Sequence, residues 1–242
     1  MKYSYGIQLY SVRDITEKNL PEALEQVAAL GYKEVEFAGF FGYSADEVKK
    51  MLDKNGLTVS GTHTGWEELT PENIEKTVEY HRTIGNHNII VPGADLSTLD
   101  KIEKFCEVMS FAQPILNNAG IHLAFHNHSR EFEVQRWGST IHSELEKRTN
   151  IDFEIDTFWA FNAGCDPIEV MDRLKDRIKV IHLKDGFKGG VGKPLGRGEA
   201  PIKEIRDYAY EHGFGIVVES ETLTPDGMTE AKECIEFLKT ID

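Results

Sequence analysis

The sequence predicts a single (β/α)8 barrel, an α/β fold known as the TIM barrel, and three observations support this. Short β-like runs alternate with longer amphipathic segments eight times along the 242 residues. No linker or break in composition divides residues 1–242, and single α/β barrels commonly have about 250 residues. An open doubly wound sheet is the main alternative. That fold usually carries a Gly-rich phosphate turn after its first strand, and YSVRDITEKN (residues 10–19) contains none.

The first four units are predicted from β-like runs followed by helix-capping signals. Their strands are expected at residues 4–10, 32–39, 57–63 and 87–93. The first helix has Pro21 near its start and Gly31 at its end, and the second has a capping box of Ser44 and Glu47 before a C-cap at Gly56. The third helix is expected to open at TPEN, from residue 70, and the fourth to end at residues 117–120.

The last four units follow the same alternation. Their strands are expected at residues 121–128, 151–159, 178–185 and 215–221, and their helices at 139–149, 166–176, 201–213 and from about 225. A short extended piece is predicted around residues 131–137. The glycines of residues 188–199 predict a loop that closes over the barrel mouth.

Charge and composition limit the partners and the cellular location that we expect for the protein. The net charge is −14 and no basic stripe interrupts it, so we expect no nucleic-acid partner. No apolar leader segment opens the chain and no run approaches about 18 apolar residues, so neither secretion nor a membrane span is indicated. Three widely spaced cysteines suit a reducing compartment, and we expect a cytoplasmic protein.

The predicted strands end in polar residues, and in this fold reactive groups lie at the C-terminal ends of the strands. The strand-end groups are Glu36, His63, His126, Asn127, His128, Asp156, His182, Lys184, Glu219 and Glu221. Alternate residues of a barrel strand point inward. His126 therefore shares a face with His128, as Glu154 does with Asp156 and His182 with Lys184, while the opposite faces are largely apolar. We expect the polar faces to line the mouth.

Two histidines and two carboxylates from neighbouring strands suggest a divalent metal site. Imidazole and carboxylate both bind such ions, and clustered acids without a cation would repel one another. The candidate ligands are His126, Asp156, His182 and Glu219. Each candidate also has a structural interpretation when it is considered alone. A histidine at a strand end more often forms structural hydrogen bonds than binds a metal. Asp156 could cap the following helix, and Glu219 could form an ion pair with Lys184. The coincidence of four strand ends favours the metal site. Surface positions are predicted for His81, His87, His142 and His212.

The strand-end motifs together resemble the sugar phosphate isomerase/epimerase superfamily, the xylose isomerase-like TIM barrels. They are GIQLYSVR, EVEFAG, LAFHNHSREFE, EIDTFWAFNAGCDP, VIHLKD, PLGRGEAPIKEI and VVESE. The resemblance implies a bound Mn, Co, Mg or Zn ion held by Glu, Asp, His and Glu from strands 5 to 8. Asp156, His182 and Glu219 match the last three positions, whereas His126 stands where a glutamate is usual. The H-N-H sequence resembles a subgroup near enzymes that process 3-keto-glycosides.

The resemblance implies a keto-sugar isomerase or epimerase that transfers a proton through an enediolate. Glu219 is the candidate general base, and a coordinated His126 would be a poor one. Lys184, if its pKa is lowered, would supply a second acid/base group, and His128 and Glu36 are the other candidates. One alternative is a lyase or dehydratase that performs β-elimination on a 3-keto-sugar or 3-keto-glycoside. An alternative of another class is a non-catalytic sugar-binding or partner subunit.

The expected partner is a small carbohydrate. The candidates for its binding are Gln8, Glu36, His63, Asn127, Trp159 and Arg197. The sequence leaves open which sugar binds, whether it is phosphorylated, and whether the chain forms a homo-oligomer or a hetero-complex.

Overall fold

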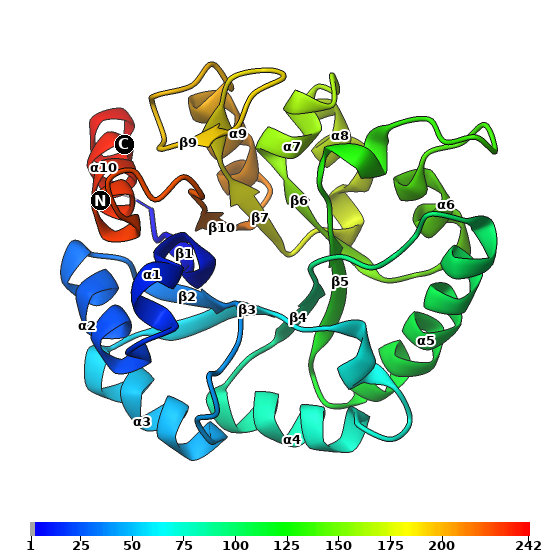
Figure 1. Ribbon diagram of the computed structural model, residues 1–242, viewed down its shortest axis with the longest axis horizontal. Coiled ribbons are helices and arrows are strands. Elements are labelled where there is room, and N and C mark those ends of the chain that lie inside the picture. Colours follow the sequence, from blue (N-terminus) through cyan, green and yellow to red (C-terminus); the bar gives the residue numbers. More distant parts are fainter. Residues whose placement is uncertain (1–2) are drawn as a thin grey trace.

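Eight parallel strands close into a barrel in the computed structural model, which describes residues 3–242 (Figure 1). The strands are β1 (Gly6–Gln8), β2 (Glu34–Phe37), β3 (Thr58–His63), β4 (Asn88–Val91), β5 (His122–His126), β6 (Asp152–Asp156), β7 (Val180–Leu183) and β10 (Gly215–Val218). Around the barrel they follow the order β1-β10-β7-β6-β5-β4-β3-β2. The predicted (β/α)8 barrel is confirmed, and only Met1 and Lys2 of the predicted domain lie outside the described residues.

Helices form a ring outside the strands (Figure 1). They are α1 (Arg13–Thr16), α2 (Leu20–Leu30), α3 (Ala45–Asn55), α4 (Ile74–Ile84), α5 (Leu99–Asn118), α6 (Ile141–Arg148), α7 (Thr157–Asn162), α8 (Pro167–Leu174), α9 (Ile202–Glu211) and α10 (Gly227–Ile241). The capping box of Ser44 and Glu47 is present at α3. Gly31 and Gly56 end α2 and α3 in left-handed conformations, as predicted. Within residues 3–242, no helix has the length and apolar character needed to span a membrane.

Several predicted strands extend beyond the observed ones; the eighth, for example, was expected at residues 215–221, but β10 ends at Val218. Two of the differences in boundaries follow from side-chain hydrogen bonds. The sixth strand was expected to continue to residue 159, but β6 ends at Asp156, whose Oδ1 accepts a hydrogen bond of 2.8 Å from the backbone N–H of Trp159. The following apolar residues therefore start helix α7. The helix expected from Thr70 begins at Ile74, because the Thr70 hydroxyl donates to the Glu67 carbonyl at 3.2 Å instead of capping a helix.

The alternation of inward and outward residues is confirmed. Leu123 and Phe125 of β5, and Phe153 and Ile155 of β6, are buried in the hydrophobic core, on the face opposite the polar residues. Their burial fixes the register of these strands, because a slip of one residue would place polar groups against the helices.

The surface positions predicted for His81 and His142 are wrong, since both side chains are buried. The His142 ring stacks against Phe132 and Phe153, at centroid distances of 4.7 and 4.5 Å. The His81 Nδ1 accepts a hydrogen bond of 2.9 Å from the Asn86 side chain. Both histidines lie on helix faces that pack inward, which composition alone does not reveal.

The loop after β7 is organised by one buried carboxylate. It contains the short hairpin of β8 (Asp185–Gly186) and β9 (Gly192–Lys193). The Asp185 carboxylate accepts hydrogen bonds of 2.8–3.1 Å from the backbone N–H groups of Gly186, Gly196, Gly198 and Ala200. A Cβ at position 198 would lie 2.2 Å from Asp185 Oδ1, so glycine is required there by close approach. Closure of the loop over the mouth stays a prediction.

We predict that Asp185→Ala lowers the free energy of unfolding by about 3 kcal/mol, because several buried N–H groups lose a charged acceptor. Urea denaturation measures this change, and limited proteolysis should show faster cleavage within residues 187–199. Asp176→Asn, at an exposed position, is the control and should change neither. Unchanged denaturation and proteolysis in Asp185→Ala would show that Asp185 does not organise the loop.

Burial lowers the pKa of His81 to about 4, so the ring stays neutral in the folded protein while the unfolded chain takes up a proton below about pH 6.5. Stability should therefore fall as the pH falls from about 6.5 to 4, and His81 contributes up to about 3 kcal/mol of this loss. In His81→Gln, the pH dependence of the free energy of unfolding should be shallower by this amount. The exposed-site variant His212→Gln should match the wild type, and equal slopes in all three proteins would contradict the assignment.

Candidate functional site

Five of the ten strand-end polar groups line one pocket at the barrel mouth, namely His63, His126, His128, Glu219 and Glu221. A pocket of about 350 Å³ opens there, and its lining includes polar groups from β3, β5 and the ends of β1, β5 and β10. The lining residues are Tyr10, Ala38, His63, Pro92, His126, His128, Glu219 and Glu221. A ligand in this pocket would therefore touch side chains from several strands, as is usual for a barrel of this type.

The imidazole of His182 is the centre of the polar cluster. Its side chain is fully buried, with Nε2 2.7 Å from Glu36 Oε1 and Nδ1 3.3 Å from Glu219 Oε2. Burial alone would lower the pKa of His182, but the charges of Glu154, Glu36 and Glu219 outweigh it and raise the pKa well above its ordinary value. Each nitrogen of this ring thus faces a different group of carboxylates.

The first group of potential metal ligands consists of Asp156, His182 and Glu219, whose donor atoms all lie within 4.8 Å of one another. The His182 Nδ1 lies 3.3 Å from Glu219 Oε2 and 3.9 Å from Asp156 Oδ2. Ligand atoms on one ion lie about 3 Å apart when the bonds are about 2.1 Å long. Asp156 Oδ2 is buried and has no hydrogen-bond partner, and Lys184 Nζ lies 3.8 Å from it, so this oxygen could still bind a cation. These residues fit a divalent metal ion.

The second group lies one layer deeper and shares His182. Glu154 Oε2 lies 3.0 Å from His63 Nε2, 3.1 Å from His126 Nδ1 and 3.3 Å from His182 Nε2. The potential ligand atoms of these four residues also lie within 4.8 Å of one another, so this group could hold an ion as well. The four ligands predicted from the sequence therefore do not form one group. His126 belongs to the deeper group, Asp156 and Glu219 belong to the first, and His182 belongs to both.

Glu36 and Glu154 hold the histidines in place. Burial and the charge of Glu36 raise the pKa of Glu154 well above its ordinary value. Burial would also raise the pKa of Glu36, but His182 and His63 outweigh it and lower this pKa to about 2. Metal-binding histidines commonly place their second ring nitrogen against a carboxylate. His182 has such a partner in Glu36, whereas the Glu154 carboxylate beside His126 belongs to the same group of potential ligands.

The ammonium group of Lys184 is buried among three carboxylates. Its Nζ lies 2.8 Å from Glu221, 3.1 Å from Glu219 and 3.8 Å from Asp156. Burial would lower the pKa of Lys184, but these three charges raise it above its ordinary value. Lys184 was expected to transfer a proton only if its pKa were lowered. Its pKa is raised instead, so this condition is not met and the ammonium group stays charged.

Three predicted substrate-binding residues lie beneath the mouth instead of in its lining. The Gln8 side chain donates to Glu36 at 2.6 Å and accepts from the Tyr10 N–H at 2.9 Å, so both of its ends are occupied. Asn127 makes two hydrogen bonds of 3.1 Å with the backbone of Asp156. Gln8, Glu36 and Asn127 are all buried, so they position neighbouring groups and do not face the pocket.

The other predicted residues divide between the mouth and the periphery. His63 and His128 line the pocket, and the Trp159 ring lies 6.0 Å from the His128 ring and 4.8 Å from Lys184 Nζ. Arg197 does not line the mouth pocket. Its side chain is exposed and pairs with Glu233 of α10 at 3.2 Å.

Sequence reasoning assigned no role to Glu154, Glu221 or Tyr10, which the structure brings to the site or its lining. The sequence had placed Glu221 among the strand-end groups and Glu154 on the inward face with Asp156, but parity does not show that Glu221 contacts Lys184 or that Glu154 contacts the histidines. Tyr10 follows β1 in a short 3-10 helix, and no pattern in the sequence indicates its position.

Comparisons with known proteins agree with this architecture. A family model described as xylose isomerase-like TIM barrel matches residues 24–241. Comparison with curated proteins gives no match. Two crystal structures of sugar phosphate isomerase/epimerases from Parabacteroides distasonis are similar. One has 25% identity and a TM-score of 0.79, and the match covers 98% of this chain and 93% of that one. The other has 24% identity and a TM-score of 0.84, and the match covers 98% of each chain.

A D-psicose 3-epimerase from Clostridium cellulolyticum, solved with D-tagatose, has 17% identity, a TM-score of 0.74 and coverage of 99% of both chains. A probable 3-DHS dehydratase from Bacillus anthracis has 11% identity and a TM-score of 0.77, and covers 98% of this chain and 99% of that one. At these identities the likeness concerns the fold alone.

We predict that Asp156→Asn weakens binding of Mn²⁺ or Co²⁺ by about 100-fold or more, because it removes a charged donor and preserves the side-chain shape. Mass spectrometry of the purified protein and titration with Co²⁺ measure this effect. The matched control is Glu221→Gln, which also removes a carboxylate next to Lys184 but lies outside both ligand groups. Equal metal affinity in Asp156→Asn and the wild type would exclude Asp156 as a ligand.

Proposed function

Because the chain belongs to the xylose isomerase-like TIM-barrel family, we propose that it is a divalent-metal-dependent keto-sugar isomerase or epimerase that transfers a proton through an enediolate. Members of this family among the similar structures are described as isomerases, epimerases and dehydratases. The mouth pocket of about 350 Å³ falls within the usual range for small-molecule sites, about 300–1,000 Å³.

The setting of Glu219 is the single observation that carries the proposal. Its carboxylate lines the mouth and lies 3.1 Å from Lys184 and 3.3 Å from His182. Burial would raise the pKa of Glu219, but Lys184 and His182 outweigh it and hold the pKa well below its ordinary value. The group is therefore ionised at neutral pH, yet it is a weak base. It can remove a proton only from an acidified C–H.

A divalent ion held by Asp156, His182 and Glu219 would supply that acidification, by drawing electron density from the substrate carbonyl when bound. Glu219 then accepts the proton from the carbon beside the carbonyl and returns it to the adjacent carbon. The neutral imidazole of His128 moves the hydroxyl proton between the two oxygens of the enediolate. Burial, the largest influence on it, lowers the pKa of His128 and keeps the ring uncharged. The proton count is unchanged over the cycle.

Lys184 serves this reaction as a fixed positive charge. Its raised pKa and three carboxylate neighbours prevent it from exchanging a proton readily. The ammonium group holds Glu219 in its ionised state and offsets the negative charge that develops on the substrate oxygens.

A lyase or dehydratase acting on a 3-keto-glycoside is the second candidate. The two proton-transfer groups, a carboxylate and an imidazole, are unlike each other, and such a pair serves β-elimination as readily as isomerisation.

We keep the expectation of a cytoplasmic protein that acts on a small carbohydrate, and the net charge of −14 supports the absence of a nucleic-acid partner. If the protein catalyses no proton exchange on any ketose, we would conclude that it is a non-catalytic sugar-binding or partner subunit.

We predict that Glu219→Gln lowers the rate of proton–deuterium exchange at the carbon beside a ketose carbonyl by about 10²–10⁴-fold, because the base is lost. The exchange is followed by NMR on ketoses and 3-keto-glycosides, at saturating Mn²⁺ or Co²⁺ and with metal content measured in the same samples. Asp176→Asn, at an exposed position outside the mouth lining, should keep the rate within a few-fold. An unchanged rate in Glu219→Gln at full metal occupancy would overturn the assignment of the base.

A further inference from the structure

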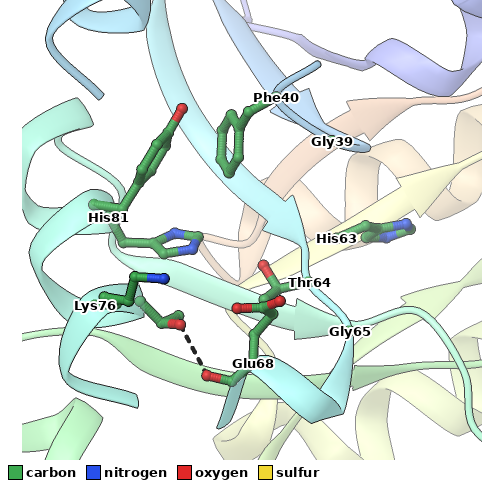
Figure 2. Close-up of a pocket in the computed structure, with 10 residues that line it drawn as sticks. Gly39, Phe40, His63, Thr64, Gly65, Glu68, Lys76 and His81 are labelled. Atoms are coloured by element: carbon green, nitrogen blue, oxygen red, sulfur yellow. Dashed lines mark hydrogen bonds between the residues drawn. The ribbon is translucent and has the colours of Figure 1, made fainter. Parts of the chain in front are cut away.

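A second cavity, of about 430 Å³, lies beside the barrel mouth. It is formed by the loop after β2, the end of β3, the short turn at residues 66–69 and α4. His63 lines both this cavity and the mouth pocket. Figure 2 shows Phe40, His81, Lys76 and Glu68 pointing toward a common space, while His63 points away from it toward the barrel interior. Among the described residues, His63 is the one that the two linings share.

An aromatic wall forms one side of the cavity. The rings of Phe40 and Tyr80 lie 4.3 Å apart, and Phe40 also packs on the core residue Phe37 at 5.2 Å. The Tyr80 hydroxyl donates a hydrogen bond of 2.8 Å to the Tyr43 carbonyl, which fixes the ring. A rigid pair of aromatic faces is suited to stacking against another ring, aromatic or sugar.

His81 supplies an oriented hydrogen-bond donor. The Asn86 side chain donates to the Asn88 carbonyl and accepts from the Asn88 N–H, which settles the orientation of its amide. The same amide nitrogen donates to His81 Nδ1 at 2.9 Å, so the ring proton resides on Nε2. Within residues 3–242, His81 Nε2 has no hydrogen-bond partner, although the residue is 2% exposed and lines the cavity. This buried donor is available to a ligand.

The charges of the cavity favour a neutral ligand. Lys76 and Glu68 both line it, and neither forms an ion pair within the described part of the chain. A phosphate group would meet one cation and one carboxylate here, and so would gain little net attraction. Hydroxyl groups can donate to Glu68 and accept from Lys76 or His81, so they suit the same lining.

We propose that this cavity is a subsite for a second, neutral hydroxylated ring joined to the sugar at the mouth. The substrate class is then a glycoside, either a disaccharide or the glycoside of a phenolic ring, instead of a free or phosphorylated monosaccharide. The ring would stack on Phe40 and Tyr80 and accept a hydrogen bond from His81 Nε2. This inference rests on the proposed function for its sugar at the mouth, but the cavity can be tested by binding alone.

Equilibrium binding to Glu219→Gln, in which turnover is suppressed, tests the subsite by calorimetry and ligand-observed NMR. The probes are glucose, glucose 6-phosphate, cellobiose and phenyl β-glucoside. We expect one or both two-ring probes to bind about tenfold more tightly than glucose, and the preferred one identifies the kind of second ring. Equal affinity for one-ring and two-ring probes, or preference for glucose 6-phosphate, would overturn the proposal.

Variants of Phe40 in the same background locate the effect. Phe40→Ala should abolish the tenfold preference and leave glucose binding unchanged, which also shows that the barrel remains folded. Phe40→Tyr should restore the preference, because the aromatic face returns. The matched control is Phe41→Ala, since Phe41 is the next residue in the same loop, is exposed and does not line the cavity. Preference retained in Phe40→Ala would contradict the assigned subsite.

The two proposals fail separately. If Glu219→Gln retains proton exchange while the two-ring preference depends on Phe40, the assignment of the base is wrong and the subsite stands. If exchange is lost but the Phe40 variants have no effect on binding, the proposed function stands and the subsite is wrong.

Discussion

The buried ammonium group of Lys184 supplies the positive charge around which three carboxylates gather at the barrel mouth. Asp156, Glu219 and Glu221 lie within 4 Å of it, and without a cation their negative charges would repel one another. Because the ammonium group is fully enclosed, it is held by these contacts and by the ring of Trp159. The same contacts keep it charged, so in the proposed reaction the lysine would stabilise negative charge and leave proton transfer to Glu219 and His128.

His182 connects this charged mouth to a second layer inside the barrel. One of its nitrogens faces Glu219 and the other faces Glu36. The pairing of β6 with β7 sets Asp156 opposite His182, and that of β5 with β6 sets His126 opposite Glu154. Strand register therefore decides which residues share a layer, and it explains why His126 lies with the deeper glutamate.

The mouth pocket and the side cavity meet at His63, which links the reaction site to the proposed subsite. The mouth holds the carboxylates, histidines and lysine to which the proposed reaction is assigned. The side cavity has one cation, one carboxylate, a fixed imidazole donor and two aromatic rings. This difference in lining separates the two tasks, because a charged site favours proton transfer whereas a nearly neutral aromatic one favours recognition of a ring.

Local patterns in the sequence determined the barrel, the inward faces of its strands and the presence of His126, Asp156, His182 and Glu219 near one rim, because alternation and strand-end position are local properties. Tertiary structure alone decided the rest. The division of the ligands, the raised pKa of Lys184, the burial of Gln8 and His81, and the distance of Arg197 from the mouth all depend on contacts between residues far apart in the chain. Register and burial set those contacts, and neither can be read from one strand by itself.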